Sequence, residues 1–338
     1  MESSVPPRGA VIGLGMMGRH HARILQSNAA MRFAGAVDPG GDRFGAVADR
    51  ARVFGTIEEM LAVERPEFAV VAVPTEEHLP AVRELTAAGV NVLVEKPVAA
   101  TAAEAREIIG LVADAGLVGA VGHVERCNPA LRELRRRLPD LGEVYSVATE
   151  RVGPFPDRIR DVGVVKDLAT HDLDLVRWLG GAPIARVAAQ TSHRMGRDHE
   201  DLVLVTGRLA NDRAFNCVVD WLTPRKIRET RVLGEGGMFV ADTLNADLWF
   251  YANAHVSTGG WAADAARRGV AEGDVTKFAL RREEPLAAEL EAFCALVGGN
   301  DSAPVVTLAE GLETVVVAEA VLESAASGAS VDLTGSAA

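Results

Sequence analysis

Apolar residues in the first 125 positions follow an alternating pattern. Short continuous apolar runs, which are typical of buried strands, are each followed by a stretch with helical spacing. The predicted strands cover residues 10–12, 31–37, 68–73, 90–94 and 118–124, and the predicted helices cover 19–25, 56–63, 79–88 and 102–113. Strand–helix units of this length predict a doubly wound parallel sheet. Such a sheet binds its ligand beyond the carboxyl ends of the strands.

The pattern changes near residue 126. Helices are predicted at 129–138, 165–179, 286–297 and 308–327, and strands at 143–152, 184–192, 201–209, 214–221, 228–234, 237–242, 247–251 and 275–281. Successive strands without helical crossovers predict a large, open, mostly antiparallel sheet. We therefore expect an α/β protein with two domains, residues 1–125 and 126–338. The stretch 253–273, rich in Ala and Gly, is either a mobile lid or a plain surface loop.

The composition is typical of a globular protein. The 338 residues are 48% hydrophobic and 24% charged, which is enough to bury full cores without disulfides or metals. The net charge of −12 disfavours nucleic acid and anionic membranes as partners. No apolar run approaches the roughly 20 residues of a membrane span, and the N-terminus carries an acidic residue where a signal peptide is basic. Because Cys127, Cys217 and Cys294 lie far apart, we expect reduced thiols, a cytoplasmic protein and no metal centre.

A glycine motif directly follows the first predicted strand. Gly13, Gly15 and Gly18 form G-x-G-x-x-G, with Met16 and Met17 between the last two glycines, and a helical stretch follows. The first glycine permits a tight turn, the second lets backbone amides approach a pyrophosphate, and the third lets the helix pack on the strand. The helix N-terminus would then face the phosphates. The motif in this context predicts dinucleotide binding.

An acidic residue ends the second predicted strand, about twenty residues further on, where dinucleotide-binding proteins hold the adenine-ribose hydroxyls. This residue is Asp38, and its carboxylate would repel a 2′-phosphate. We therefore expect NAD as the cofactor. Arg43 lies close enough in sequence to contact the same end of the cofactor and leaves NADP use open.

Other polar groups lie at the ends of later strands. Pro74, Thr75 and His78 follow the strand at 68–73, and Glu95-Lys96-Pro97 follows the strand at 90–94. An ammonium at this edge of the sheet, near the nicotinamide end of the cofactor, can hydrogen-bond a substrate hydroxyl or lower its pKa. Pro97 would fix the turn, through either a trans or a cis bond. The alternative interpretation of Lys96 is an ordinary surface lysine in a loop.

The predicted helix at 165–179 carries the second chemical group. Asp167, His171 and Asp174 lie at i, i+4 and i+7, beside an apolar stripe of Leu168, Leu175 and Leu179. A carboxylate one turn from an imidazole can fix the histidine tautomer and stabilise the imidazolium, and histidine exchanges protons near neutral pH. The alternative is an ordinary ion pair on a solvated face.

With these motifs in this order, the chain resembles the glucose-fructose oxidoreductase and inositol dehydrogenase family, Gfo/Idh/MocA. The resemblance implies an N-terminal NAD-binding Rossmann domain, expected at 1–125, and a C-terminal α/β domain for substrate binding and oligomerisation, expected at 126–338. It implies that Lys96 contacts the reacting hydroxyl, that Asp167 binds and orients the substrate, and that His171 is the acid/base. His78 matches a recurrent histidine near the cofactor, and Asp174 is interpreted as structural. The family's open sheet implies a homodimer or homotetramer.

Two stretches, 123–129 and 167–174, resemble the family members that act on nucleotide-activated sugars. Arg126, Asn128 and Lys166 then become candidate substrate contacts. In this chain Cys127 replaces a usual aromatic residue, and the glycine run that often precedes the catalytic Asp is reduced to Gly163. The resemblance implies hydride transfer between NAD and a ring carbon of such a sugar, with C3 as the expected position. The alternatives are an inositol or free-sugar dehydrogenase and a non-catalytic NAD-sensing regulator.

Overall fold

The computed structural model describes residues 6–156, 162–254 and 272–334. The chain divides into two compact units, Met1–Cys127 with Glu284–Val316, and Asn128–Glu283 with Val317–Ala338. The expected domains, 1–125 and 126–338, differ from this division in two respects: the first boundary lies two residues later, and residues 284–316 belong to the first unit. Most of the proposed lid, at 255–271, lies outside the described residues.

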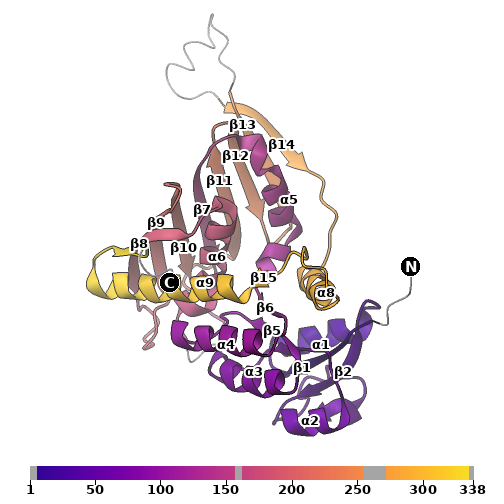
Figure 1. Ribbon diagram of the computed structural model, residues 1–338. Helices are drawn as coiled ribbons and strands as arrows, with labels where there is room; N and C mark the ends of the chain where they lie inside the picture. The colour runs from indigo at the N-terminus through magenta and orange to yellow at the C-terminus, as the bar shows by residue number, and fades with distance from the viewer. Residues whose placement is uncertain (1–5, 157–161, 255–271, 335–338) are drawn as a thin grey trace, which may run out of the picture. The chain divides into compact units, whose positions relative to one another are not determined.

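The first unit contains a seven-stranded sheet with the order β15-β6-β5-β4-β1-β2-β3 (Figure 1). Its strands are β1 (Arg8–Ile12), β2 (Arg32–Val37), β3 (Val53–Phe54), β4 (Phe68–Val71), β5 (Asn91–Glu95), β6 (Gly119–Gly122) and β15 (Val306–Thr307). Strands β1 to β6 pair in parallel, which confirms the predicted doubly wound sheet, and β15 adds an antiparallel edge. The two-residue strands β3 and β15 were not predicted, because so short a run has no detectable period.

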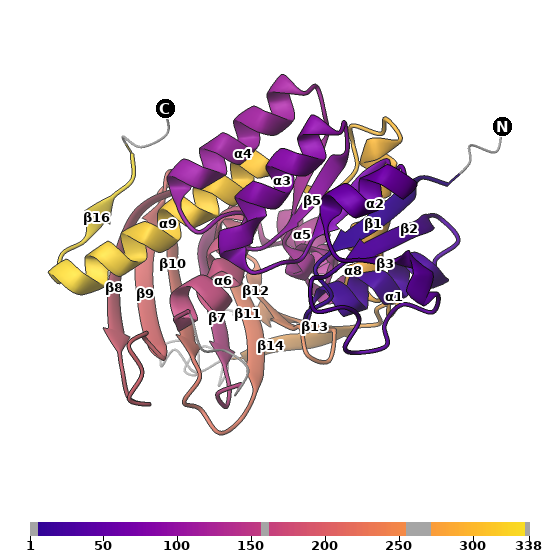
Figure 2. The same ribbon diagram turned by 90° about the horizontal axis from the view of Figure 1, so that it is seen from below.

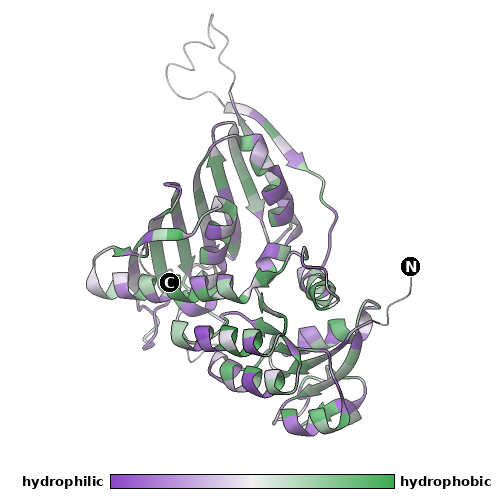
Figure 3. Ribbon diagram, viewed as in Figure 1, coloured by the Kyte–Doolittle hydropathy of each residue, from purple (hydrophilic) through white to green (hydrophobic). Residues whose placement is uncertain are grey.

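Helices cover both faces of this sheet (Figure 2). They are α1 (Gly18–Ser27), α2 (Ile57–Val63), α3 (His78–Ala87), α4 (Ala102–Asp114), α8 (Pro285–Val297) and the start of α9 (Leu308–Ser327). One core packs α1 and α8 against the strands, and the other packs α2, α3, α4 and α9 against the opposite face. Because both faces are covered, the central residues of these strands are apolar, whereas β1, β2 and β5 begin with Arg or Asn and β5 ends with Glu95 (Figure 3). Thr56 caps α2 in the predicted capping box with Glu59.

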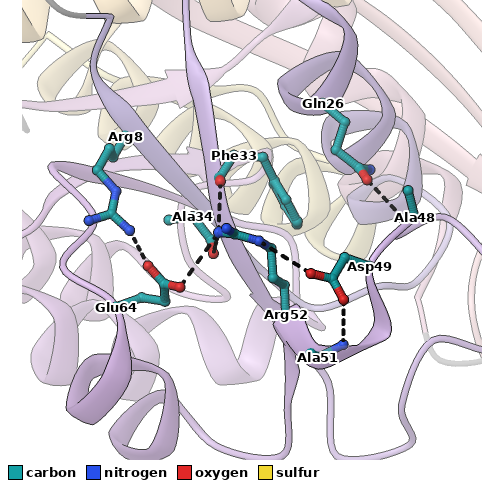
Figure 4. Close-up of polar contacts among 9 residues, drawn as sticks. All are labelled: Arg8, Gln26, Phe33, Ala34, Ala48, Asp49, Ala51, Arg52 and Glu64. Carbon is teal, nitrogen blue, oxygen red and sulfur yellow. Dashed lines mark hydrogen bonds and ion pairs between the residues drawn. The ribbon is translucent and has the colours of Figure 1, made fainter.

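The connection between β2 and β3 contains no α-helix and is held by side chains (Figure 4). Arg52 donates to the backbone oxygens of Phe33 (3.3 Å) and Ala34 (3.0 Å) on β2. Gln26 on α1 accepts from the Ala48 amide at 2.9 Å and donates to the Ala46 oxygen at 2.7 Å. Two further ion pairs join Arg52 to Asp49 and Glu64. The loop that begins at Asp38 is therefore anchored to both α1 and β2.

The second unit contains a nine-stranded sheet with the order β14-β13-β12-β11-β7-β10-β9-β8-β16. Its strands are β7 (Val144–Val152), β8 (Ile184–Ser192), β9 (Leu202–Leu209), β10 (Ala214–Asp220), β11 (Ile227–Gly234), β12 (Gly237–Asp242), β13 (Asp247–Asn253), β14 (Glu272–Phe278) and β16 (Val331–Asp332). All neighbours are antiparallel except β7 and β10, which are parallel. The predicted mostly antiparallel sheet is confirmed. Strand β14 begins and ends three residues before the predicted range 275–281.

Helices α5 (Pro129–Arg137) and α6 (Thr170–Gly180), with the end of α9, supply the core on one face of this sheet. Residues on the strands alternate, so that Val203, Val205, Phe215 and Cys217 are buried in this core. The opposite face carries exposed apolar side chains, among them Leu204, Leu233, Tyr251 and Val275. No helix in the described part of the chain is long and apolar enough to cross a membrane.

Candidate functional site

The glycine loop has the geometry that a dinucleotide needs. Gly13 has a φ of +91°, and a Cβ there would lie 2.6 Å from the Ala72 backbone oxygen. A Cβ on Gly18 would overlap the Gly13 carbonyl, so helix and strand approach closely only without side chains. A Cβ on Gly15 would meet no atom within 4 Å, which leaves open space for an approaching ligand. The exposed Met16 and Met17 border this space.

The N-terminus of α1 has features that suit an anion, although the Arg19 and His20 amides donate to the backbone oxygens of Gly15 and Met17. Met17 at the N-cap makes no side-chain hydrogen bond, and the first turn contains no acidic residue. Amides in a first helical turn carry a partial positive charge and need acceptors. These features fit a pyrophosphate at this position, so the residues of the loop are suited to hold a dinucleotide.

Asp38 lies directly after β2, where a ribose would be bound. Its Oδ2 accepts from the Leu14 amide at 2.9 Å and its Oδ1 accepts from the Gly40 amide at 2.8 Å. Each carboxylate oxygen keeps a second lone pair for a hydroxyl donor. The guanidinium of Arg43 lies against the Cα of Gly40, two residues after Asp38. Asp38 and Arg43 therefore both lie near the start of the loop that follows β2.

His78 is buried, and its ring nitrogens lie 3.2 Å from the backbone oxygens of Val73 and Val98. Burial lowers the pKa of His78, so that the neutral ring donates to only one of these oxygens. The ring thus joins the turn after β4, where Pro74 and Thr75 lie, to the turn after β5. With both nitrogens directed at protein carbonyls, His78 would act on a cofactor indirectly, by placing these turns.

Lys96 follows β5 immediately, and the Lys96–Pro97 bond is cis. Glu95, the last residue of the strand, is buried and accepts from the Lys96 amide at 3.2 Å. His21 on α1 bonds the other oxygen of Glu95 at 2.7 Å. Lys96 itself is half-buried. The lysine is therefore held at the carboxyl edge of the sheet, where the sequence placed it.

The catalytic segment predicted at 165–179 is a helix with one unexpected feature. Residues Val165–Ala169 form a π-helical turn that runs into α6. Such wide turns are rare and frequently lie at functional sites. Almost all of α6 is buried, whereas Lys166, Asp167 and His171 are half-buried. The alternative of an ordinary solvated helix face does not fit a helix buried on most of its circumference.

The start of this segment is held by Glu200, which sequence reasoning missed. Its buried carboxylate accepts from the Val165 amide at 3.0 Å, and its backbone oxygen accepts from the Val164 amide at 3.0 Å. A Cβ on Gly163 would overlap the carboxylate of Glu200. This close approach explains why a glycine remains at position 163.

Two acidic residues on α6 are buried and paired. Asp172 accepts from Arg151 on β7 at 2.7 Å, and Asp174 lies 3.5 Å from Arg177. Asp174 is therefore structural, as expected. The stripe of Leu168, Leu175 and Leu179 is confirmed for the last two, while Leu168 is only half-buried.

Two of the candidate substrate contacts, Asn128 and Arg126, make hydrogen bonds within the protein. Asn128 is the N-cap of α5, because its Oδ1 accepts from the Ala130 amide at 3.0 Å and its Nδ2 donates to the Thr243 oxygen at 3.1 Å. Both ends of its amide thus serve the fold, and each keeps one further hydrogen-bonding position. The nearly buried guanidinium of Arg126 donates to Glu310 at 2.9 Å, which occupies at least one of its nitrogens.

Among the described residues, no cluster of three or more His, Cys, Asp or Glu side chains could hold a metal ion. The three cysteines are buried free thiols. Burial raises the pKa of the Cys294 thiol to about 12 and also raises that of Cys217. Cys217 and Cys294 are therefore unreactive near neutral pH.

A Rossmann unit with an open glycine loop, joined to an α/β unit with a large sheet and a half-buried Asp–His pair, defines a two-domain dinucleotide-dependent oxidoreductase. The chain belongs to the Gfo/Idh/MocA oxidoreductase family. Residues 8–123 match its NAD-binding Rossmann fold, and residues 139–333 match its C-terminal alpha/beta domain. The resemblance, the fold class and the expectation of an NAD-binding oxidoreductase are thereby confirmed.

Similar proteins span nearly the whole chain. The UDP-N-acetylglucosamine 3-dehydrogenase of Acidithiobacillus ferrooxidans is 30% identical over 324 residues, which cover 94% of this chain and 98% of that enzyme. A solved structure of that enzyme superimposes with a TM-score of 0.82 at 27% identity, covering 95% and 97% of the two chains. An inositol 2-dehydrogenase of Rhizobium meliloti is 26% identical, covering 94% of this chain and 97% of its own length.

Proposed function

We propose that this oxidoreductase transfers a hydride between NAD and C3 of a nucleotide-activated sugar. The observation that carries the proposal is the presence of a half-buried Asp167 and His171 on a mostly buried helical segment, together with Lys96 directly after β5. A pure NAD-sensing module needs none of these groups. The similarity to the UDP-N-acetylglucosamine 3-dehydrogenase over almost the full length of both chains supports the nucleotide-sugar branch.

NAD, held by the glycine loop and Asp38, would supply the acceptor for the hydride of the sugar carbon. The Lys96 ammonium donates a hydrogen bond to the reacting hydroxyl oxygen and stabilises negative charge on it. His171 takes the hydroxyl proton, and Asp167, one turn earlier, orients the substrate. The C–O bond becomes a carbonyl as the C–H and O–H bonds break. In the reverse direction His171 returns the proton to the ketosugar.

We propose Lys166, with Arg126 and Asn128, as contacts for the part of the substrate outside the reacting carbon. Lys166 precedes Asp167 in the π-helical turn, is half-buried, and carries a positive charge that suits the phosphates of a nucleotide sugar. We also propose that the enzyme works in the reducing cytoplasm, which agrees with three free thiols.

The substrate class is tested by incubating the purified protein and NAD with UDP-sugars, inositols and free hexoses, and recording NADH. The proposal expects turnover with a UDP-sugar at least tenfold more efficient than with the other two classes. Preferred oxidation of an inositol or a free sugar would instead show that the protein is an inositol or free-sugar dehydrogenase. Tight NAD binding without turnover on any sugar would favour a regulator.

The cofactor preference is expected to depend on the Asp38 carboxylate. Asp38→Asn should lower the ratio of kcat/KM with NAD to kcat/KM with NADP by about tenfold, because the charge that repels a 2′-phosphate is lost. Asp49→Asn, an exposed carboxylate in the same anchored loop, is the matched control and should leave the ratio unchanged. An unchanged ratio in Asp38→Asn would exclude this role.

We further propose that the exposed face of the nine-stranded sheet joins two copies of the chain. Leu204 pairs across strands with Val218, and Tyr251 with Val275, and most of these apolar side chains are exposed on the single chain. Leu204→Glu combined with Leu233→Glu should convert an oligomer into a monomer, measured by light scattering. Val63→Glu, at an exposed apolar position of the first unit, should leave the mass unchanged.

A further inference from the structure

The first unit contains a buried group of titratable side chains that the proposed reaction does not use. His21, Glu95 and Glu289 are 0%, 7% and 6% exposed, respectively. His21 Nε2 lies 2.7 Å from Glu95 Oε1, and Glu95 Oε2 accepts from the backbone amide of Lys96 at 3.2 Å. One oxygen of Glu289 and Nδ1 of His21 have no hydrogen-bond partner in the described part of the chain. His21 and Glu95 are thus hydrogen-bonded in the interior behind Lys96, and Glu289 is a second buried carboxyl group whose pKa the charge of Glu95 raises.

This group joins three elements. His21 lies in the first turn of α1, the helix that the glycine loop opens, and Glu95 ends β5. Glu289 is on α8, which packs with α1 on the same face of the sheet, where Phe293 meets Phe68 with ring centroids 5.7 Å apart. The His21–Glu95 hydrogen bond therefore connects the pyrophosphate-facing helix to the residue that precedes Lys96.

The pKa values of the two buried carboxyl groups are shifted in opposite directions. Burial and the neighbouring charge of Glu95 raise the pKa of Glu289 well above its ordinary value. Burial also raises the pKa of Glu95, but the hydrogen bond and charge of His21, with the charge of Lys96, outweigh it and leave a net lowering. An ionised carboxylate only accepts, so His21 Nε2 is the donor in their hydrogen bond.

We propose that His21 and Glu95 are positioning residues for Lys96, and that Glu289 stays protonated beside them so that the cluster holds a single carboxylate charge. Two buried carboxylates whose charges interact would repel each other, which the proton on Glu289 avoids. Glu95 then keeps a fixed negative charge next to the Lys96 ammonium. This inference rests on the proposed role of Lys96, and its first test does not depend on turnover.

The first test measures the free energy of unfolding against pH for the full chain and for Glu289→Gln. A group whose pKa is raised on folding contributes fully below its unfolded pKa, near 4.5, and this contribution is lost as pH rises toward the folded value. Glu289→Gln should therefore gain stability relative to the wild type as pH rises above about 4.5. Glu291→Gln, at an exposed position on the same helix, should show no such gain. A difference that is constant with pH would overturn the protonated Glu289.

An infrared spectrum provides a second measurement of the same proton. A protonated carboxyl group absorbs separately from carboxylates, and its band at neutral pH should be present in the wild type and absent in Glu289→Gln. The band should persist in Glu291→Gln. A spectrum without this band in the wild type would contradict the assignment even if Glu289→Gln fails to fold.

The positioning role is tested with Glu95→Gln and His21→Asn. Both should lower kcat by about 10- to 100-fold with little change in NAD affinity, since a misplacement of about 1 Å costs this order of rate. In Glu95→Gln the high-pH limb of the kcat profile should also move to lower pH, an effect that simple loss of packing does not produce. Glu95→Asp should restore part of the rate, and His20→Asn, on the outer side of α1, is the control. Unchanged kcat and pH profile in Glu95→Gln would refute the role.

A chemical readout separates this inference from the proposed function. The rate at which an amine reagent modifies Lys96, followed by mass spectrometry against pH, reports the state of the lysine without any substrate. In Glu95→Gln the modification rate should begin to rise at a lower pH than in the wild type. If Lys96 takes no part in catalysis, this shift persists while the sugar assays fail; identical modification profiles would instead refute the positioning cluster.

Discussion

Replacing His171 by alanine is expected to lower kcat by about 10²- to 10⁴-fold, the usual contribution of general acid–base assistance. His171 is one of the half-buried polar residues of a helical segment whose core-facing positions are fully buried, so its removal changes the site more than the fold. The dinucleotide loop and Asp38 belong to the other unit, and NAD affinity should therefore remain the same. The measurement is kcat with a UDP-sugar together with an independent NAD titration.

Two controls make this prediction specific. His193→Ala changes an exposed histidine of the same unit and should leave kcat unchanged. Added imidazole should restore part of the activity of His171→Ala, because a small base can replace the missing proton acceptor. Normal turnover in His171→Ala would assign the proton to another group, and Lys96→Met would be the next variant to measure.

The fold of the first unit follows from its sequence to within a few residues. Buried strands that alternate with amphipathic helices are typical of one arrangement, a parallel sheet covered on both faces. The capping box at Thr56 is a local signal that depends on neighbouring residues alone, and it is confirmed. The return of residues 284–316 could not be predicted in the same way. The apolar face of α8 indicates burial, but it contains no information about which sheet it covers.

In the candidate site, too, features that depend on local sequence were predicted, and features that depend on residues distant in sequence were not. Sequence patterns predict strand ends well, and a strand end directly precedes the glycine motif, Asp38 and Lys96. The π-helical turn at Val165–Ala169 was not predicted, because it depends on Glu200, a residue distant in sequence that accepts from the start of the segment. Asn128 precedes Pro129, and because an Asn before a Pro is a common start of a helix, its structural role as the N-cap of α5 could have been predicted besides the proposed substrate contact.

His21 and Glu289 were missed for a different reason. The sequence shows that His20 and His21 lie on opposite sides of a helix, but it does not show which acidic group His21 meets. The spacing of His21 with Ile24 and Leu25 places it on the buried face of α1. A titratable residue at a core position indicates a buried partner, and this signal was available before the structure.

The buried ion pair beneath the proposed catalytic helix is expected to have the largest effect on stability. Arg151 Nε donates to Asp172 Oδ2 at 2.7 Å, with side-chain exposures of 5% and 2%. Asp172→Ala should lower the free energy of unfolding by about 3–5 kcal/mol, because an uncompensated guanidinium remains buried between β7 and α6. Denaturant unfolding measures this loss, and Asp212→Ala, in an exposed pair with Arg208, should lose no more than about 1 kcal/mol. Similar losses in the two variants would contradict the prediction.

The same pair offers a way to separate stability from catalysis. Burying two charges costs desolvation energy that their attraction only partly offsets, so replacing both partners by apolar residues of similar size is often neutral or stabilising. Arg151→Met combined with Asp172→Leu should therefore recover most of the stability that Asp172→Ala loses. Because Asp172 follows His171 directly, activity reports whether the ion pair also sets the orientation of α6. A stable double variant with low kcat would show that the pair places His171, and one with normal kcat would show that it serves the fold alone.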